Sequence, residues 1–402
     1  MFDIAILGQV ALGYSPFIDR NRSVKATRLT VFALRQGVDL DAAELLNAVA
    51  GVWPAGGARV SLNVTSESLL RDLLGSNLPT NVMVEVPAFM AVDERNVDSI
   101  RQLHRQGVEL LIKGRPLSEL PRAILPCFKY SIIDLSDDRR IIDRREPPSG
   151  VVRSIAHVQS GVRTMVDMEA SFRRGASAVL GWPFDDLGGE QPDEAGRSAV
   201  HPALQVIVDL INQVDRGEDI ERLEQSLKRD PSLAYKLMRY INSAAFGFQV
   251  EIGSFRHAIM LLGYQRLKRW LALLLATASK NADMQPVMFA AVRRGMLMEE
   301  LTRASSEESM RDEIFICGVF SLLDCMFRQP FAELLQSIPV ADRVRQALVD
   351  GSGPYMPYLE LVRAIESESR SDYLLAAEGL MLGETEINRA VLRSLSTAAQ
   401  LG

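Results

Sequence analysis

The sequence predicts two domains of different fold class, an α/β barrel followed by an all-helical domain. Up to about residue 185, short apolar runs of strand type alternate with amphipathic helical stretches, whereas after about residue 198 only helical periodicity remains. The stretch between them is rich in glycine, proline and acidic residues, which is typical of a linker. A chain of 402 residues is long enough for this arrangement. We therefore expect domains at 1–185 and 198–402 and a linker at 186–197.

The first domain contains seven expected strands. They are Ile4–Leu12, Arg59–Val64, Asn81–Val86, Glu109–Ile112, Tyr130–Asp134, Val151–Ala156 and Ser177–Leu180. Helices are expected between them at Leu29–Gly37, Leu40–Ala50, Ser66–Leu74, Glu94–Gly107 and Thr164–Arg174. This alternation predicts parallel strands joined by right-handed crossovers. The spacing indicates a β/α barrel smaller than the usual ~250 residues.

Chemistry in a β/α barrel takes place at the carboxyl ends of the strands. The residues expected there are Asn63, Glu85, Lys113 with Gly114, Asp134, His157 or its neighbours, and Gly181 with Trp182. Two divalent cations need several carboxylates around them. This set contains two carboxylates, and Lys113 adds a positive charge among them. A metal pair is therefore electrostatically disfavoured, and we expect no metal, no cofactor and no catalytic residue.

Several segments of the first domain carry a family resemblance. They are Gln9 with Tyr14–Asp19, Val60–Thr65, Glu85–Ala88, Gly107–Gly114 and Tyr130–Asp134. On these segments, residues 1–185 resemble an EAL domain, the family whose active members hydrolyse the bacterial messenger cyclic di-GMP. The resemblance implies that ligand-type residues remain at Asn63, Glu85 and Asp134. It also implies that metal ligands are lost at Thr27, Ala88, Lys113 and Gly114, which describes a degenerate EAL domain.

The helical half carries a second resemblance. Asp230 precedes Pro231 as a helix cap, Ser254 can cap another helix, and Gly263 is placed where a left-handed helix end is needed. Together with Leu233, Asn242, Ser243, Ala258 and Leu262, these residues resemble an HDOD domain, a helical relative of HD phosphohydrolases without their metal ligands. Neither His201 nor His257 precedes an aspartate, so a His-Asp metal cluster is not expected. We expect these motif residues to be structural or to bind a partner.

Composition narrows the class of partners. The net charge of −6 argues against a general nucleic-acid binder.

The sequence also predicts where the protein is located. The start of the chain lacks the basic region of a signal peptide, and its most apolar stretch, Trp270–Ala278, is too short to cross a bilayer. Cys127, Cys317 and Cys325 are too scattered for a disulfide framework and are expected to be buried thiols. We expect a cytoplasmic protein that associates with no membrane; the sequence leaves oligomerisation open.

Three functional hypotheses follow. The first is a non-catalytic signalling protein that acts through protein–protein contacts in a regulatory network related to cyclic di-GMP. The second is a receptor that binds cyclic di-GMP without hydrolysis. The third is an active phosphodiesterase with rearranged ligands. Loss of the ligand positions favours the first, and its partners are expected to be signalling proteins rather than cyclic di-GMP itself.

Overall fold

The computed structural model describes residues 4–35, 37–138, 155–187, 202–228, 235–237, 254–277, 279, 281–303 and 308–401. Backbone contacts divide the chain into two compact units. The first unit combines residues 1–186 with 285–287 and 360–399, and the second holds 187–284, 288–359 and 400–402.

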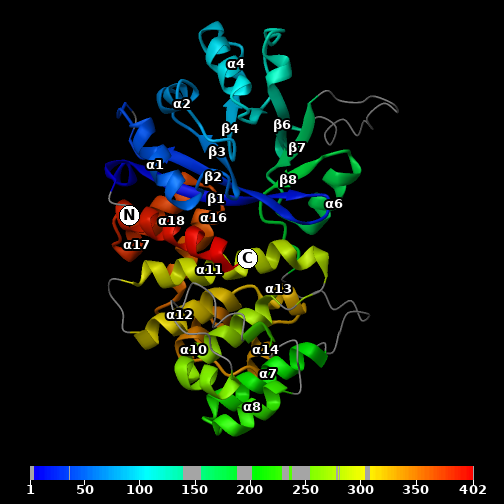
Figure 1. The fold of residues 1–402 in the computed structure, drawn as a ribbon, viewed down its shortest axis with the longest axis vertical. Coiled ribbons are helices and arrows are strands. Elements are labelled where there is room, and N and C mark those ends of the chain that lie inside the picture. Colours follow the sequence, from blue (N-terminus) through cyan, green and yellow to red (C-terminus); the bar gives the residue numbers. More distant parts are fainter. Residues whose placement is uncertain are drawn as a thin grey trace. The chain divides into compact units, whose positions relative to one another are not determined.

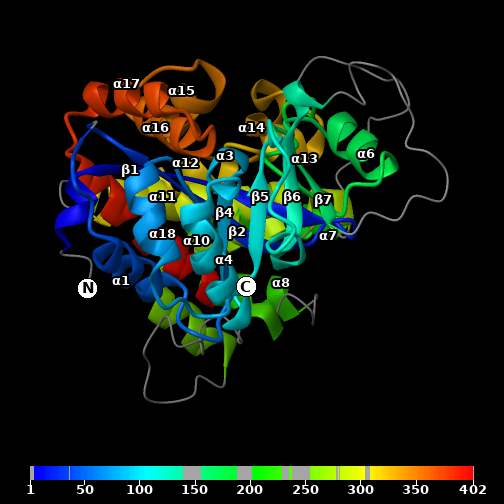
Figure 2. The same cartoon turned by 90° about the horizontal axis from the view of Figure 1, so that it is seen from above.

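The first unit is built around a closed barrel of eight strands that follow one another in sequence order. The strands are β1 (Val10–Asp19), β2 (Val24–Ala33), β3 (Arg59–Val64), β4 (Val82–Pro87), β5 (Leu110–Lys113), β6 (Phe128–Asp134), β7 (Ala156–Ser160) and β8 (Ala178–Leu180). β1 is antiparallel to both of its neighbours, and the other pairs are parallel. Figure 2 shows β4 to β7 side by side. The predicted fold class, a barrel followed by helices, is confirmed.

Three of the expected elements were wrong. The first strand was expected at Ile4–Leu12, but Ala5–Gly8 forms a 3-10 turn and β1 runs from Val10 to Asp19. The helix expected at Leu29–Gly37 is instead the second half of β2, which forms a hairpin with β1. Its side chains alternate between the two faces of the barrel wall, and pairing with β1 outweighs local helix propensity. The sixth expected strand was placed at Val151–Ala156, but the corresponding strand, β7, begins at Ala156, so its carboxyl end falls on Ser160 rather than near His157.

The α-helices of the first half lie on the crossovers, and all but the short one at Ala88–Ala91 were expected. They are α1 (Ala42–Val52), α2 (Glu67–Leu74), α3 (Ala88–Ala91), α4 (Val97–Arg105) and α6 (Met165–Arg173), with short 3-10 turns at Ala5–Gly8, Glu94–Asn96, Leu125–Cys127 and Leu135–Asp137. Asp41, Ser66 and Thr164 accept hydrogen bonds from the first backbone amides of α1, α2 and α6. Such side-chain caps satisfy amides that have no partner inside the helix, which explains where these helices begin.

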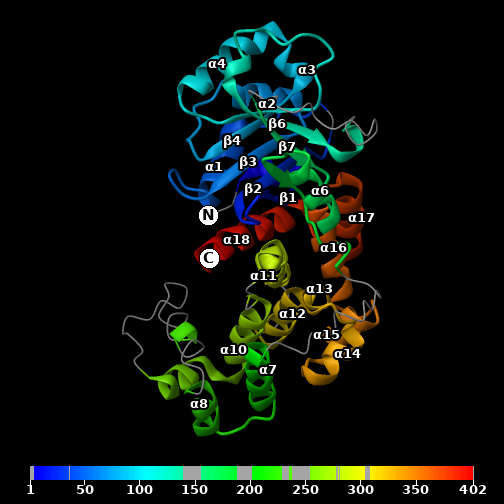
Figure 3. The ribbon, with the colours of Figure 1, turned by 90° about the vertical axis from the view of Figure 1, so that its right-hand side faces the viewer.

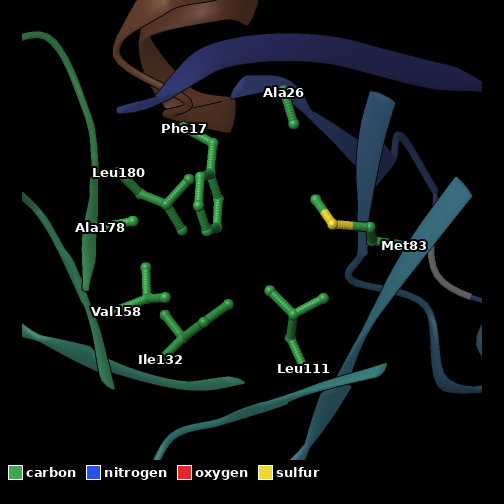
Figure 4. Close-up of a cluster of buried hydrophobic side chains, with 8 residues drawn as sticks. All are labelled: Phe17, Ala26, Met83, Leu111, Ile132, Val158, Ala178 and Leu180. Atoms are coloured by element: carbon green, nitrogen blue, oxygen red, sulfur yellow. The ribbon is translucent and has the colours of Figure 1, made fainter. Parts of the chain in front are cut away.

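An apolar layer fills the barrel interior (Figure 4). It consists of Phe17, Ala26, Met83, Leu111, Ile132, Val158, Ala178 and Leu180. These residues come from seven of the eight strands and are all at most 5% exposed. Because side chains alternate along a strand, the residues two positions further along β2, β4, β5 and β6 face the same interior, nearer the carboxyl ends. This layer therefore forms the floor below the mouth, our name for the barrel end where β2 to β8 finish.

The end of the chain belongs to the barrel unit. It comprises α16 (Met356–Glu366) from Glu360 onward, α17 (Arg370–Leu380) and α18 (Glu384–Leu401) up to Ala399. Figures 1 and 3 show these orange and red helices next to the blue β1 and β2. The predicted second domain reached residue 402, and the structure differs here. The reason is tertiary: β1 pairs with β8 only over Phe17–Asp19, so the first part of β1 has an open edge that these helices cover.

Asn388 of α18 closes that open edge. Its side-chain carbonyl accepts the amide N–H of Leu12 at 3.0 Å, and its Nδ2 donates to the carbonyls of Leu7 and Val10 at 2.8 and 2.6 Å. The side-chain amide thus pairs with β1 as a neighbouring strand would. Asn388 is fully buried, so these hydrogen bonds satisfy backbone groups that have no access to water.

The described part of the second unit is helical. Its helices are α7 (Pro202–Asp215), α8 (Ile220–Lys228), α10 (Phe255–Thr277), α11 (Gln285–Leu301, from Met288), α12 (Glu308–Phe320), α13 (Leu323–Phe327), α14 (Phe331–Ser337) and α15 (Asp342–Val349). Among the described residues, no helix is long and apolar enough to cross a membrane. All three cysteines are buried, as predicted.

Candidate functional site

The inner face of the mouth carries polar side chains from β2 to β5. Arg28 of β2 lies opposite Ser61 of β3, and Thr30 lies opposite Asn63. Glu85 of β4 lies two residues beyond the interior Met83. The resemblance placed a lost metal ligand at Thr27, but the register puts Thr27 on the other face of β2. The interior position is taken by Arg28, so a cation stands on the inner wall of β2.

Arg28 forms a buried ion pair with Glu85. Its Nε and Nη2 donate to the two carboxylate oxygens of Glu85 at 2.8 and 2.7 Å. The Arg28 side chain is 8% exposed and that of Glu85 is inaccessible. Ser61 donates a further hydrogen bond to Glu85 at 3.1 Å. This two-pronged geometry is the strongest form of the arginine–carboxylate contact, and it occupies both oxygens of Glu85.

A second carboxylate reaches Arg28 from the far end of the chain. Glu368 lies between α16 and α17, and its carboxylate accepts hydrogen bonds from Arg28 Nη1 at 2.9 Å and from the hydroxyl of Thr30. Burial opposes the charge on Arg28, but the two carboxylates outweigh burial, so the pKa of the guanidinium is raised. The backbone of Glu368 has a left-handed φ of 53°, which turns the chain at this point. Glu368 therefore plugs the mouth beside β1 and β2.

Gly13 makes room for this plug. A Cβ atom at Gly13 would lie 2.9 Å from the carbonyl oxygen of Ile365 and 3.3 Å from the Cα of Glu368. Both distances are shorter than ordinary van der Waals contact, so a side chain here would push the turn between α16 and α17 outward. Gly13 is thus needed for close backbone approach rather than for an unusual φ.

Lys113 of β5 completes the polar group. Its Nζ donates to Asn63 Oδ1 at 2.9 Å, and Asn63 Nδ2 donates to Thr30 at 3.0 Å. Burial and the nearby charge of Arg28 lower the pKa of Lys113, against the attraction of Glu85, Glu368 and Asp134. Arg28 and Lys113 together carry two positive charges, and Glu85 and Glu368 carry two negative ones. We call these four residues the mouth network.

The donor set in the mouth does not suit a pair of divalent cations. The oxygens of Glu85 are held by Arg28 and Ser61, and the amide oxygen of Asn63 is held by Lys113. A divalent cation at this position would also be repelled by both Arg28 and Lys113. In the described part of the chain, no three acidic, histidine or cysteine side chains gather in a way that could hold a metal ion.

The remaining predicted mouth residues are spread around it. Asp134 accepts hydrogen bonds from the amide and hydroxyl of Ser136 and from the hydroxyl of Ser160, so it stabilises its own strand end. Ala88 is buried at the start of α3, and Gly114 has a left-handed φ of 80°.

His157 and Trp182 do not take part in the mouth network. His157 is buried at the start of β7, far along the strand from the mouth, with its Nε2 3.2 Å from Gln159 Oε1. Expecting His157 at the mouth was wrong, because β7 runs to Ser160. Trp182, which follows Gly181, donates from its indole to the carbonyl of Tyr14 at 3.3 Å.

A cavity of about 670 Å³ opens at the mouth over β3, β4 and β5. Lys113 and Asn63 lie at its polar side, and Leu70, Met90 and Phe89 contribute apolar wall. The loop after β5 adds further lining, including Arg115 and Leu117. Glu368 does not line this cavity, so the plug fills the β1–β2 side of the mouth and leaves the β3–β5 side open.

Arg28, Thr30 and Glu368 were missed by sequence reasoning. A one-residue shift on β2, chosen by the alternation of its side chains, would have identified Arg28 and Thr30. No local signal identifies Glu368, because its contacts are made with residues more than 330 positions away.

In the helical half, Asp230, Pro231, Leu233, Asn242 and Ser243 lie outside the described residues. Ala258 and Leu262 are buried on α10. Gly263 interrupts α10 with φ 69° and ψ 169°. The helix break and the positive φ predicted for it are confirmed, but its ψ is extended rather than that of a left-handed helix. Ser254 accepts the amide N–H of the exposed His257 at 3.2 Å, which confirms it as a cap.

Two curated proteins match most of this chain. The chain is 24% identical over 322 residues to YuxH, an uncharacterized protein of Bacillus subtilis, in a match that covers 78% of this chain and 77% of YuxH. It is 23% identical over 314 residues to the cyclic di-GMP phosphodiesterase CdgJ of Vibrio cholerae, covering 77% of this chain and 71% of CdgJ.

A solved EAL domain and a family model also match. The EAL domain of DcpA from Mycobacterium smegmatis is similar with a TM-score of 0.30 and 20% identity, over 43% of this chain and 90% of that one. Residues 201–333 match the model of the HDOD domain. The second half of this chain therefore contains an HDOD domain.

Proposed function

We propose that this chain is a non-catalytic cytoplasmic signalling protein that acts by binding other proteins in a network related to cyclic di-GMP. One observation carries the proposal: the mouth network ties Glu85 to Arg28 and balances its charges with the chain's own Glu368. Of the ligand-type side chains, Glu85 is engaged with Arg28 and Asn63 with Lys113. The barrel then serves as a shaped surface rather than as a reaction centre.

The second candidate is a protein that binds or cleaves cyclic di-GMP. The name of CdgJ, a cyclic di-GMP phosphodiesterase, favours it. A ligand with two phosphates would meet Lys113 and Arg115 in the cavity, which are suitable charges. Against this candidate, Glu368 neutralises the nearest guanidinium, Arg28, and fills the β1–β2 side of the mouth.

Incubation of the full chain with cyclic di-GMP and Mg²⁺ or Mn²⁺ tests the proposal. We expect no linear product and, in a calorimetric titration, no saturable heat at micromolar ligand. Saturable heat without product would establish the receptor instead. Metal-dependent product that disappears in Glu85→Ala, but persists in the exposed-site control Glu378→Ala, would establish the phosphodiesterase and overturn the proposal.

A further inference from the structure

The open cavity at the mouth has a cationic side with unused hydrogen-bonding capacity. An ammonium group carries three N–H donors, and Asn63 takes one from Lys113. Within the part of the chain that the structure describes, no other acceptor engages Lys113. Arg115 lies exposed on the same cavity, and no acceptor among the described residues holds its guanidinium either. This side of the cavity thus offers donors for an anion.

Much of the remaining lining of the cavity is apolar and partly exposed. The side chain of Phe89 is 56% exposed and that of Leu117 is fully exposed, while Leu70 and Met90 form buried wall beneath them. Exposed large apolar side chains beside a cavity are characteristic of interaction sites. A suitable occupant therefore combines a negative group with apolar surface.

The β1–β2 side of the mouth already binds one anion, a carboxylate. Arg28 and Thr30 bind the carboxylate of a glutamate delivered by a protein segment, the turn that carries Glu368. Lys113 stands next along the inner wall, joined to Thr30 through Asn63. The mouth therefore has one carboxylate position filled by the chain itself and one set of donors left open.

We propose that the open cavity binds a segment of a partner protein in which an acidic side chain is flanked by apolar ones. The carboxylate is received by Lys113 and Arg115, and the apolar side chains lie against Phe89 and Leu117. This inference rests on the proposed function, because it gives the interaction a place on the barrel and a chemical class of partner. The charged residues of the cavity lining are Lys113, Arg115 and Glu67, so cations outnumber carboxylates there. This charge balance and the adjacent Glu368 contact favour an acidic peptide over a neutral one.

Selection of displayed peptides on the full chain tests the inference. The probe is a library of random peptides of about twelve residues, the length of a typical recognition segment. We expect enriched peptides to share an acidic residue next to apolar residues. Synthetic copies should lose at least about tenfold in affinity, or ~1.4 kcal/mol, when that acid is replaced by its amide.

Two kinds of variant locate the binding site. Lys113→Met removes the ammonium group that would donate hydrogen bonds to the peptide carboxylate. The double variant Phe89→Ser, Leu117→Ser changes only exposed apolar side chains, so we expect it to fold like the parent. Both should weaken the selected peptides at least about tenfold. The control Lys25→Met removes an exposed lysine elsewhere on the barrel and should leave affinity unchanged.

Failure of this inference can be told apart from failure of the proposed function. If no peptide is enriched, if enriched peptides lack acids, or if they bind Lys113→Met and the apolar variant as tightly as the parent, the inference is overturned. A chain without phosphodiesterase activity and without cyclic di-GMP binding would in that case still satisfy the proposed function. Hydrolysis of cyclic di-GMP would overturn the proposed function whatever the peptides do.

Discussion

Glu368 and Arg28 lie 340 positions apart in the sequence, yet a hydrogen bond of 2.9 Å joins them inside the barrel. The contact connects the end of the chain to the second strand and gives the barrel mouth a balance of two positive and two negative charges.

Replacing Glu368 by glutamine should destabilise the barrel unit. Arg28 and Lys113 would then share a single carboxylate, and breaking a buried ion pair typically costs 3–5 kcal/mol, so we expect a loss of about 3 kcal/mol in the free energy of unfolding. Urea denaturation, with hydrogen exchange resolved by segment to assign the change to the barrel, measures it. The control Glu378→Gln alters an exposed carboxylate on α17 and should be neutral. Equal stability of the two variants would show that Glu368 does not balance the mouth.

Replacing Gly13 by alanine should lift the turn that carries Glu368. The new methyl group would lie 2.9 Å from the Ile365 carbonyl, and overpacking of this kind costs about 1–3 kcal/mol. Faster hydrogen exchange of residues 364–370 is the expected readout. The control Gly379→Ala places a methyl group on α17 where no atom lies within 4 Å, so it should be neutral or slightly stabilising. Unchanged exchange in Gly13→Ala would contradict the tight approach of the two segments.

Replacing Asn388 by leucine should open the free edge of β1. The Leu12 amide and the carbonyls of Leu7 and Val10 would lose their partner while remaining buried, at a cost of about 1–3 kcal/mol for each unsatisfied group. Exchange of the Leu12 amide should accelerate well beyond that of amides in β4, which serve as the internal reference. Protection of Leu12 that survives the substitution would mean that another group covers this edge.

Binding of the selected acidic peptides should weaken as pH rises, and it should do so at a lower pH than it would with a lysine of ordinary pKa. Burial and the charge of Arg28 lower the pKa of Lys113, and only the protonated amine attracts a carboxylate. Affinity should therefore fall as pH rises through the lowered pKa of Lys113, which lies below the usual ~10.4. Fluorescence anisotropy over a pH series measures this decline. Lys113→Arg should move it to higher pH, whereas a decline at the same pH in both proteins would exclude Lys113 as its origin.

Local patterns were sufficient for most of the helices and for the cysteines. Asp41, Ser66 and Thr164 are short polar side chains placed where a helix must begin, so their sequence neighbourhood already predicts α1, α2 and α6. The positive-φ break at Gly263 was likewise readable, because glycine adopts this conformation without steric cost. Local pattern was misleading at Leu29–Gly37, where pairing with β1 produced a strand.

The sequence by itself determined that a barrel precedes a helical domain and that the mouth is poor in carboxylates and holds Lys113. The domain order and the composition of the mouth can be predicted because they depend on which residue types occur at short spacings along the chain. Only the tertiary structure decided that Arg28, rather than Thr27, faces the interior, that the last helices belong to the barrel, and that Glu368 enters the mouth. The physical reason is that register, edge pairing and charge balance are set by contacts between distant segments, and no window of sequence contains both partners of such a contact.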